Sequence, residues 1–269
     1  MALAMSPSSI WRALQVRRTA AAALLTLTTV LASTAPAYSV SALEPVTSPT
    51  PMTAAGITAS LSPDRRGRRA ALTLTIRFSG KTTRVPAPVR RATLNFPAGL
   101  TLEIPRLVSC SLVRLRAHGV KGCPAAARVG IGHAVIVVLA GSQLLTESVA
   151  LTAFLGPLRG LQPTVLLAGQ GYSPVERRIV LTAVLGVGPA PYGEQMVIAI
   201  PAIPTLPLEP DASLATLSLT AGTSSRRAGD HDAVRVPSTC PRGGFPFAGE
   251  FVYADGSKGA SLTTAPCPL

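Results

Sequence analysis

Four cysteines are the residues of this chain whose type and spacing most clearly specify chemistry. Cys110, Cys123, Cys240 and Cys267 allow three pairings. Ligand pairs in zinc sites usually lie about two to four residues apart, whereas these cysteines are much farther apart and the three histidines show no complementary spacing. We therefore expect no metal site and two sequence-local disulfides, Cys110–Cys123 and Cys240–Cys267.

The residue patterns of known catalytic sites are absent or incomplete. The nucleophile-elbow pattern Gly-x-Ser-x-Gly is approached by Gly171–Val175, but the second glycine is replaced and Pro174 disfavours the helix that should follow. Asp230, His231 and Asp232 form the densest titratable cluster, which we interpret as a solvated loop rather than a weak metal site or a base with its orienting group. The chain has no glycine-rich phosphate loop. We expect no catalytic residue and no cofactor.

Arg65, Arg66, Arg68 and Arg69 form the sharpest run of charge. They precede the alternating stretch Ala71–Phe78, so they are expected in a hairpin loop. Four guanidinium groups on one loop are suited to binding phosphates. The alternative is a solvated turn whose charge keeps an apolar hairpin soluble. The sequence thus indicates a candidate anion-binding loop.

The N-terminal segment has the pattern of a secretory signal peptide. Three arginines are the only charged residues before Glu44, and the uncharged run Thr19–Ala32 follows them. That run is shorter than the roughly 20 residues of a membrane-spanning helix. Small residues then favour cleavage after Ala37 or Ala42; the alternative is a buried N-terminal helix. We expect a signal peptide over residues 1–37, a disordered Pro/Thr/Ser-rich spacer over 38–55, a folded domain over 56–269, and no membrane anchor after cleavage.

Composition indicates a folded, basic protein. Hydrophobic residues make up 47% of the 269-residue chain, and its net charge is +13. Without the three N-terminal arginines, 22 basic residues remain against 12 acidic ones, a net charge of +10. A basic surface suits anionic cell-envelope polymers or lipid head groups. Aromatic residues are only 4% of the chain, which disfavours a stacking surface for nucleic acid, and we expect no nucleic-acid partner.

Short stretches of alternating or β-branched apolar residues recur along the chain, separated by turns rich in Gly and Pro. The expected strands are Ala71–Phe78, Arg91–Phe96, His133–Leu139, Ser148–Leu155, Thr164–Ala168, Ile179–Leu185, Gln195–Ile200, Leu214–Thr220, Phe247–Tyr253 and Ser261–Thr264. The stretch Ser111–Gly119 predicts a short helix between two cysteines, and the proline-rich stretch Ile200–Pro210 predicts an extended crossover between sheets. This pattern predicts an all-β, immunoglobulin-like β-sandwich of about ten or more strands, with one short helix in a disulfide-closed loop.

The layout also resembles a group of uncharacterised exported proteins from high-GC actinobacteria. The resemblance covers most of the chain after the signal segment and rests on these stretches: Thr93–Leu100, Cys110–Ser111, Cys123–Gly132, Pro201–Pro207, Cys240–Phe247, Phe251–Gly256 and Pro266–Cys267. It implies export and an immunoglobulin-like β architecture, and it brings no activity and no site residues.

Taken together, the sequence predicts an exported, non-catalytic β-sandwich protein, secreted or associated with the cell envelope, that acts by binding or as a structural component. Two alternatives remain open at this point. One is a secreted hydrolase whose site has no recognisable pattern. The other is a carrier of an apolar ligand held between the sheets, which the high aliphatic content suggests.

Overall fold

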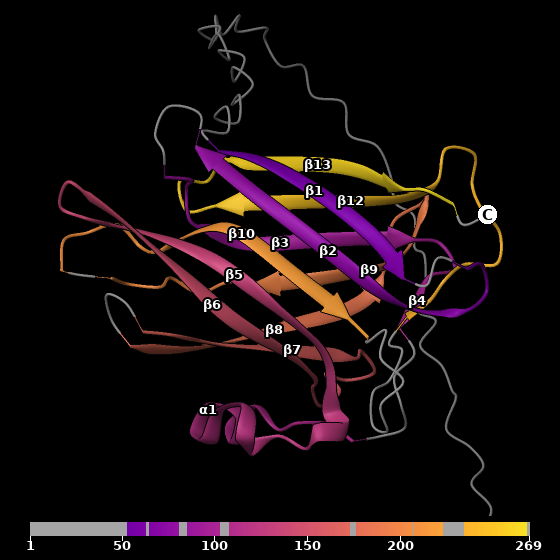
Figure 1. Ribbon diagram of the computed structural model, residues 1–269, viewed down its shortest axis with the longest axis horizontal. Coiled ribbons are helices and arrows are strands. Elements are labelled where there is room, and N and C mark those ends of the chain that lie inside the picture. The colour runs from indigo at the N-terminus through magenta and orange to yellow at the C-terminus, as the bar shows by residue number, and fades with distance from the viewer. Residues whose placement is uncertain are drawn as a thin grey trace, which may run out of the picture. The chain divides into compact units, whose positions relative to one another are not determined.

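A computed structural model describes residues 53–62, 65–80, 85–102, 108–172, 176–205, 207–222 and 234–267. The strands are β1 (Thr53–Ser62), β2 (Arg69–Gly80), β3 (Val89–Pro97), β4 (Thr101–Leu102), β5 (Arg128–Ala140), β6 (Gln143–Leu155), β7 (Thr164–Gly171), β8 (Arg177–Val187), β9 (Tyr192–Ala199), β10 (Ser213–Ala221), β11 (Val234–Arg235), β12 (Phe245–Tyr253) and β13 (Lys258–Ala265). The helices are α1 (Leu112–His118) and two short 3-10 turns, Gly119–Gly122 and Ala125–Ala127. Figure 1 shows this arrangement.

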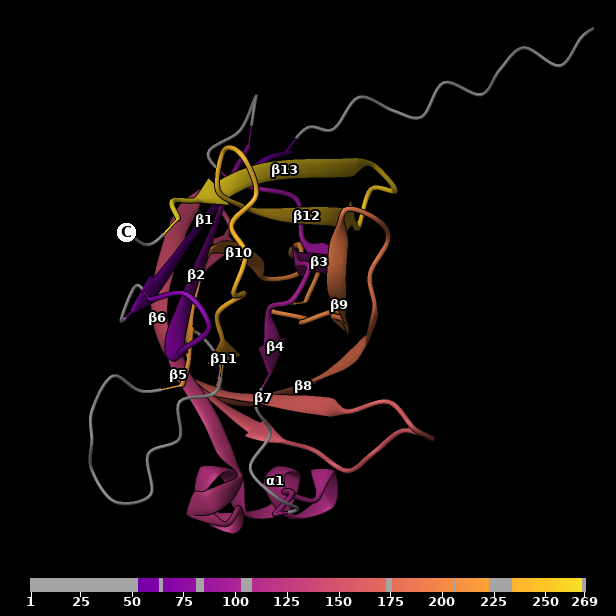
Figure 2. The same ribbon diagram turned by 90° about the vertical axis from the view of Figure 1, so that its right-hand side faces the viewer.

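The strands form one antiparallel sheet that folds over on itself. Its order is β13-β12-β3-β9-β8-β7-β6-β5-β10-β2-β11-β4, with β1 also paired to β2. The sheet folds back where β1, which is paired to β2, lies against β13: the Ile57 N–H of β1 donates a hydrogen bond of 3.1 Å to the Ser261 Oγ of β13. In Figure 2 the strands are seen around a common interior, with α1 outside it. The predicted fold class, an all-β sandwich with one short helix, is therefore confirmed.

The alternation of side chains explains which face is inside. In β2, Leu74 and Ile76 are buried in the interior. Their neighbour Thr73 points to the outer face, where its hydroxyl lies 2.9 Å from that of Thr220 on β10. Because successive side chains of a strand alternate between faces, this register places every second residue in the core.

Aromatic residues of β2, β3 and β12 fill much of the interior. The Phe78 and Phe251 rings meet edge to face with centroids 4.9 Å apart, and those of Phe96 and Phe247 lie 6.2 Å apart in the same geometry. Edge-to-face pairs of this kind add to the stability given by burial alone. The two halves of the sheet are the run β13-β12-β3-β9-β8-β7 and the run β6-β5-β10-β2 with β1. A largely apolar core holds these two halves together.

The short helix packs outside the sheet. Leu115 of α1 is fully buried in a small cluster with Phe154 and Leu166, from the outer faces of β6 and β7. Gly119 ends the helix with φ +63°, a conformation that glycine adopts without steric cost. Cys110 and Cys123 close this loop, with Cα atoms 5.2 Å apart. The predicted helix and its disulfide are confirmed.

The second predicted disulfide is confirmed as well. Cys240 and Cys267 have Cα atoms 6.0 Å apart and join the segment before β12 to the end of β13. Two disulfides are compatible with an extracellular protein, since such bonds persist in oxidising compartments. Among the described residues, no helix is both long and apolar enough to cross a membrane.

All ten stretches predicted as strands form strands, the one at Gln195–Ile200 ending at Ala199, and the described residues contain three further strands that were not predicted. Strand β1 begins at Thr53, slightly before the predicted domain boundary at residue 56. The buried Thr53 side chain accepts a 2.7 Å hydrogen bond from the Ala87 N–H, which anchors the start of the strand. The other two, β4 and β11, have two residues each and show no periodicity. The predicted signal peptide lies outside the described residues.

Candidate functional site

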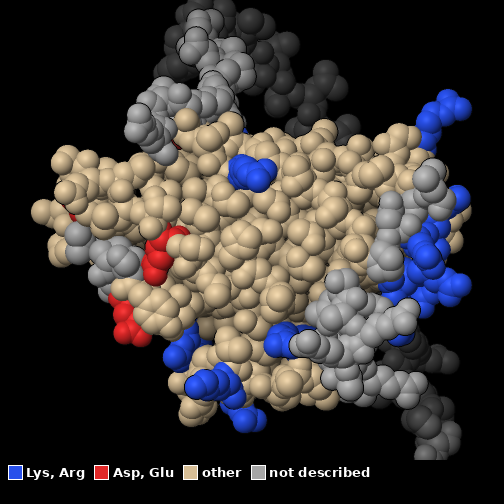
Figure 3. All heavy atoms as spheres, viewed as in Figure 1, with Lys and Arg blue, Asp and Glu red and all other residues tan. Residues whose placement is uncertain are grey.

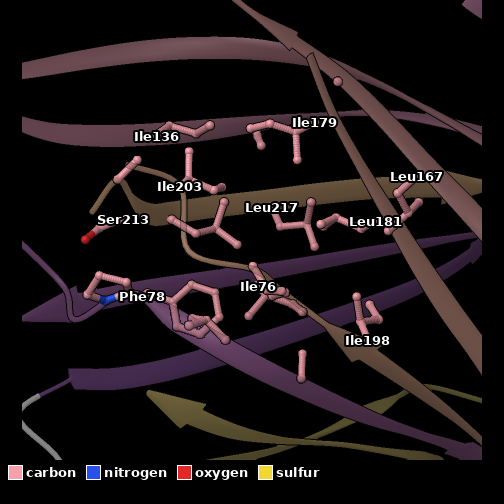
Figure 4. Close-up of a pocket in the computed structure, with 18 of the residues that line it drawn as sticks. Ile76, Phe78, Ile136, Leu167, Ile179, Leu181, Ile198, Ile203, Ser213 and Leu217 are labelled. Carbon is pink, nitrogen blue, oxygen red and sulfur yellow. The ribbon is translucent and has the colours of Figure 1, made fainter. Parts of the chain in front are cut away.

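An apolar cavity of about 100 Å³ lies between the two halves of the sheet. Figure 4 shows side chains from both halves pointing toward one another around it. The residues that line it are Ile76, Phe78, Pro88, Val89, Arg90, Ala92, Leu94, Ala134, Ile136, Val149, Leu151, Leu167, Gly169, Ile179, Leu181, Ile198, Ile200, Pro201, Ile203, Ala212, Ser213, Leu214, Leu217 and Phe251. Among them only Arg90 and Ser213 have polar side chains.

Small residues leave the space open. Ala134 on β5 and Ala92 on β3 are both buried and both line the cavity. The cross-strand partners of Ala134 are Leu217 on β10 and Val149 on β6, which line the same cavity. A larger side chain at position 134 would therefore extend into the cavity. The sequence pattern shows that this residue faces inward but not that space remains in front of it.

The proline-rich crossover covers one end of the cavity. It runs from the end of β9 to the start of β10, which belong to different halves of the sheet. The Ile200 N–H donates a hydrogen bond of 2.8 Å to the Arg90 carbonyl of β3. Within the crossover, the Ala212 N–H donates a hydrogen bond of 2.9 Å to the Ile203 carbonyl. Arg90 also forms an ion pair with Asp211. These contacts hold the crossover over the cavity in the way predicted for an extended connection between sheets.

The cavity wall next to the crossover carries charge. Ile179 of β8 and Ile203 of the crossover line the cavity and also a smaller hollow of about 40 Å³. Glu147 and Arg177 line this hollow as well. Arg177 is two residues before Ile179 in β8, so it faces the same side of the strand. An arginine and a glutamate therefore lie next to residues that line this end of the cavity.

A basic hollow of about 290 Å³ lies on the outer side of this wall. It is lined by Arg116 of α1, by Arg177 and Arg178 at the start of β8, and by the crossover. The Arg178 guanidinium donates hydrogen bonds to the carbonyls of Arg116 (2.9 Å) and Ala117 (3.2 Å) at the end of α1. Arg178 thus fixes the helix end against β8, as basic side chains often do for the last carbonyls of a helix, and places Arg116 at the hollow.

Three of the four arginines of the predicted anion-binding loop lie between β1 and β2, and Arg69 is the first residue of β2. Arg65, Arg66, Arg68 and Arg69 are all exposed. The centre of the loop is held in place, because Gly67 N–H lies 3.2 Å from a carbonyl oxygen of the segment that follows β11. Figure 3 shows basic side chains gathered at the end of the molecule where Figure 1 places this loop. Anion binding by these four arginines stays a prediction.

The catalytic alternatives find no further support in the described residues. Asp230, His231 and Asp232 lie outside them, as does the central serine of Gly171–Val175. In the part of the chain that is described, no group of three or more His, Cys, Asp and Glu side chains is arranged to hold a metal ion. Burial raises the pKa of Glu194 on β9, while a hydrogen bond from the Leu102 backbone acts in the opposite direction.

No known protein family, no curated protein and no solved structure matches this chain.

Proposed function

We propose that this chain is an exported, non-catalytic binding protein of the cell envelope, and that it holds an apolar ligand in the cavity between the two halves of its sheet. The observation that carries the proposal is the cavity itself, whose lining is apolar except at Arg90 and Ser213. A site that recognises a polar substrate offers several convergent polar groups. This cavity instead offers aliphatic surface, which favours an alkyl or isoprenoid chain.

The size of the cavity indicates how much of a ligand it holds. A volume of about 100 Å³ is somewhat below the roughly 150 Å³ of an engineered apolar cavity that binds benzene. Ligand pockets of drug-sized molecules are larger, about 300–1,000 Å³. The closed structure therefore accommodates the end of a chain rather than a whole ligand, and the remainder must lie outside or displace the crossover.

Export rests on the N-terminal pattern and on the two disulfides. The basic surface of the folded part favours retention near anionic envelope polymers or lipid head groups. The test is the intact mass of the protein from its host, measured before and after reduction and alkylation, in culture supernatant and envelope fractions separately. We expect loss of residues 1–37 or 1–42 and no alkylation before reduction. An uncut chain with free thiols contradicts the proposal.

Ligand binding is tested with a neutral, environment-sensitive naphthylamine dye that carries an octyl chain, and with octanol as a competitor. The chain after the signal segment contains no tryptophan, so intrinsic fluorescence does not obscure the dye. Ala134→Ile fills the cavity, and the matched control Ala150→Ile adds the same atoms to an exposed position on the outer face of β6. We expect at least about tenfold weaker dye binding in the first variant only. Equal binding by both variants would place the dye elsewhere and refute the proposal.

A further inference from the structure

We infer that the ligand of the cavity is a single-chain anionic amphiphile, whose alkyl chain enters the cavity between Ile179 and Ile203 and whose phosphate-like head group binds Arg116 and Arg177. The inference rests on the proposed function, because it names the chemical class of the ligand for the same cavity. Both arginines line the basic hollow, which shares Ile179, Pro201 and Ile203 with the lining of the cavity.

One wall is shared by the cavity and the basic hollow. Ile179, Pro201 and Ile203 line both spaces. A molecule that crosses this wall therefore has apolar surroundings on one side and arginines on the other. Figure 4 shows Ile179 and Ile203 among the side chains that surround the cavity. The distance between the two environments is that of one layer of side chains, which suits an amphiphile with its charge at one end.

Among the described residues, polar interactions hold the crossover to β3, to itself and to the β5–β6 turn, but not to β8. The crossover is bonded to β3 through the Ile200 N–H and the Asp211–Arg90 ion pair, and to itself through the Ala212 N–H and the Ile203 carbonyl. Gly141, in the turn between β5 and β6, donates a further hydrogen bond of 2.9 Å to Glu209. From the described residues of the crossover, no hydrogen bond runs to β8. Among the described residues, the side chains that the cavity and the basic hollow share at this gap are apolar, so an alkyl chain can part the crossover from β8 without breaking a hydrogen bond between them.

Arg116 and Arg177 are available for a head group. Neither forms an ion pair with a carboxylate in the described part of the chain. Arg178, in contrast, is occupied by the helix carbonyls and by Gln170 Oε1 at 3.3 Å. A guanidinium group presents parallel N–H donors that match phosphate oxygens, and each such charge-assisted contact is stronger than a neutral hydrogen bond.

Two carboxylates lie near these arginines and both have other partners. Glu147, at the small hollow, accepts a hydrogen bond from the Tyr172 N–H. Glu176 precedes Arg177 in the chain, and its Oε1 accepts a hydrogen bond of 3.2 Å from Gln170 Nε2. The basic hollow itself is lined by three arginines and by no acidic residue. The local charge therefore favours an anionic head over a zwitterionic or cationic one.

The experiment compares octyl phosphate, octanol and inorganic phosphate as competitors of the naphthylamine dye, on the full chain after the signal segment. The test variant is Arg116→Gln/Arg177→Gln. The matched control, Arg65→Gln/Arg66→Gln, removes the same charge from the loop between β1 and β2. We expect wild type to bind octyl phosphate about tenfold more tightly than octanol at low salt, and inorganic phosphate not to displace the dye.

In the test variant we expect this preference to disappear while octanol binding stays unchanged; unchanged octanol binding also shows that the variant is folded. In the control variant the preference should persist. Equal affinity of octyl phosphate and octanol in wild type, or a preference that survives in the test variant, overturns the inference and leaves the proposed function standing. Failure of both alkyl compounds to displace the dye refutes the proposed function itself.

Discussion

Filling the cavity should stabilise this protein, whereas most substitutions in a protein core destabilise it. The perturbation is Ala134→Ile on β5, where the side chain points into the cavity beside Leu217 and Val149. Isoleucine is favoured in strands, so the substitution does not oppose the local structure. The cavity has to accommodate the three additional carbon atoms of the isoleucine side chain.

The magnitude follows from the volume. A cavity of about 100 Å³ costs roughly 2.4 kcal/mol at ~24 cal/mol per Å³. Three added carbons gain about 0.8 kcal/mol each when buried, and ordering an isoleucine side chain costs about 0.5–1 kcal/mol. Imperfect fit lowers the gain further, so we expect a net increase of about 1–2 kcal/mol in the free energy of unfolding. For a domain of this size that raises Tm by about 2–8 °C.

The assay is reversible denaturant unfolding followed by far-ultraviolet circular dichroism, with Ala150→Ile as the control. Ala150 is exposed on the outer face of β6, so its substitution should change the unfolding free energy by less than about 0.5 kcal/mol. A loss of more than about 1 kcal/mol in Ala134→Ile would refute the reasoning, because it would mean that neighbouring side chains already occupy the space.

Three further outcomes are expected. Burial raises the pKa of Tyr253 to about 12, so this tyrosine should ionise last in a spectrophotometric titration. Below about pH 10 the Tyr253 hydroxyl is protonated in both the folded and the unfolded state. As the pH rises from about 10 toward 12, it ionises in the unfolded state before it does in the folded state, so the free energy of unfolding falls. Tyr253→Phe should reduce this loss of stability at alkaline pH. Replacing Cys110 and Cys123 together by alanine should lower the free energy of unfolding by about 3 kcal/mol in denaturant titrations, as for a closed loop of this length. Asp211→Asn breaks the ion pair that holds the crossover to Arg90 and should speed dye dissociation severalfold in stopped-flow measurements, whereas an unchanged rate would show that the crossover does not limit access.

The local features of the fold could be predicted from the sequence because they depend on neighbouring residues. Alternating stretches such as Leu72–Ile76 show a half-buried strand directly. Gly119 marks a helix end, and the turn at Asp255 and Gly256 joins β12 to β13 as a hairpin signal predicts. The disulfides followed from the same locality, since cysteines close in sequence meet when a short helix or a hairpin brings them back together.

The candidate site could not be predicted in the same way, because it is made of residues far apart in the chain. Alternation shows that Ala134 faces inward, but only the packing of opposite strands decides whether space remains before it. Arg116 and Arg177 become neighbours because the disulfide-closed loop docks on β8 through Arg178. The run at residues 65–69 was conspicuous in the sequence, whereas these two arginines were not. Charge density along a chain is therefore a weak guide to charge density on a surface.

Binding of an alkyl chain inside the sheet can be measured by intermolecular NMR contacts between octyl phosphate and methyl-labelled protein. We expect contacts from the terminal methyl of the octyl chain to Leu217 and Ile198, which line the cavity. We also expect contacts from the carbon next to the phosphate to Val180, which lines the basic hollow. Contacts confined to exposed residues such as Val187, with none to Leu217 or Ile198, would contradict binding inside the sheet.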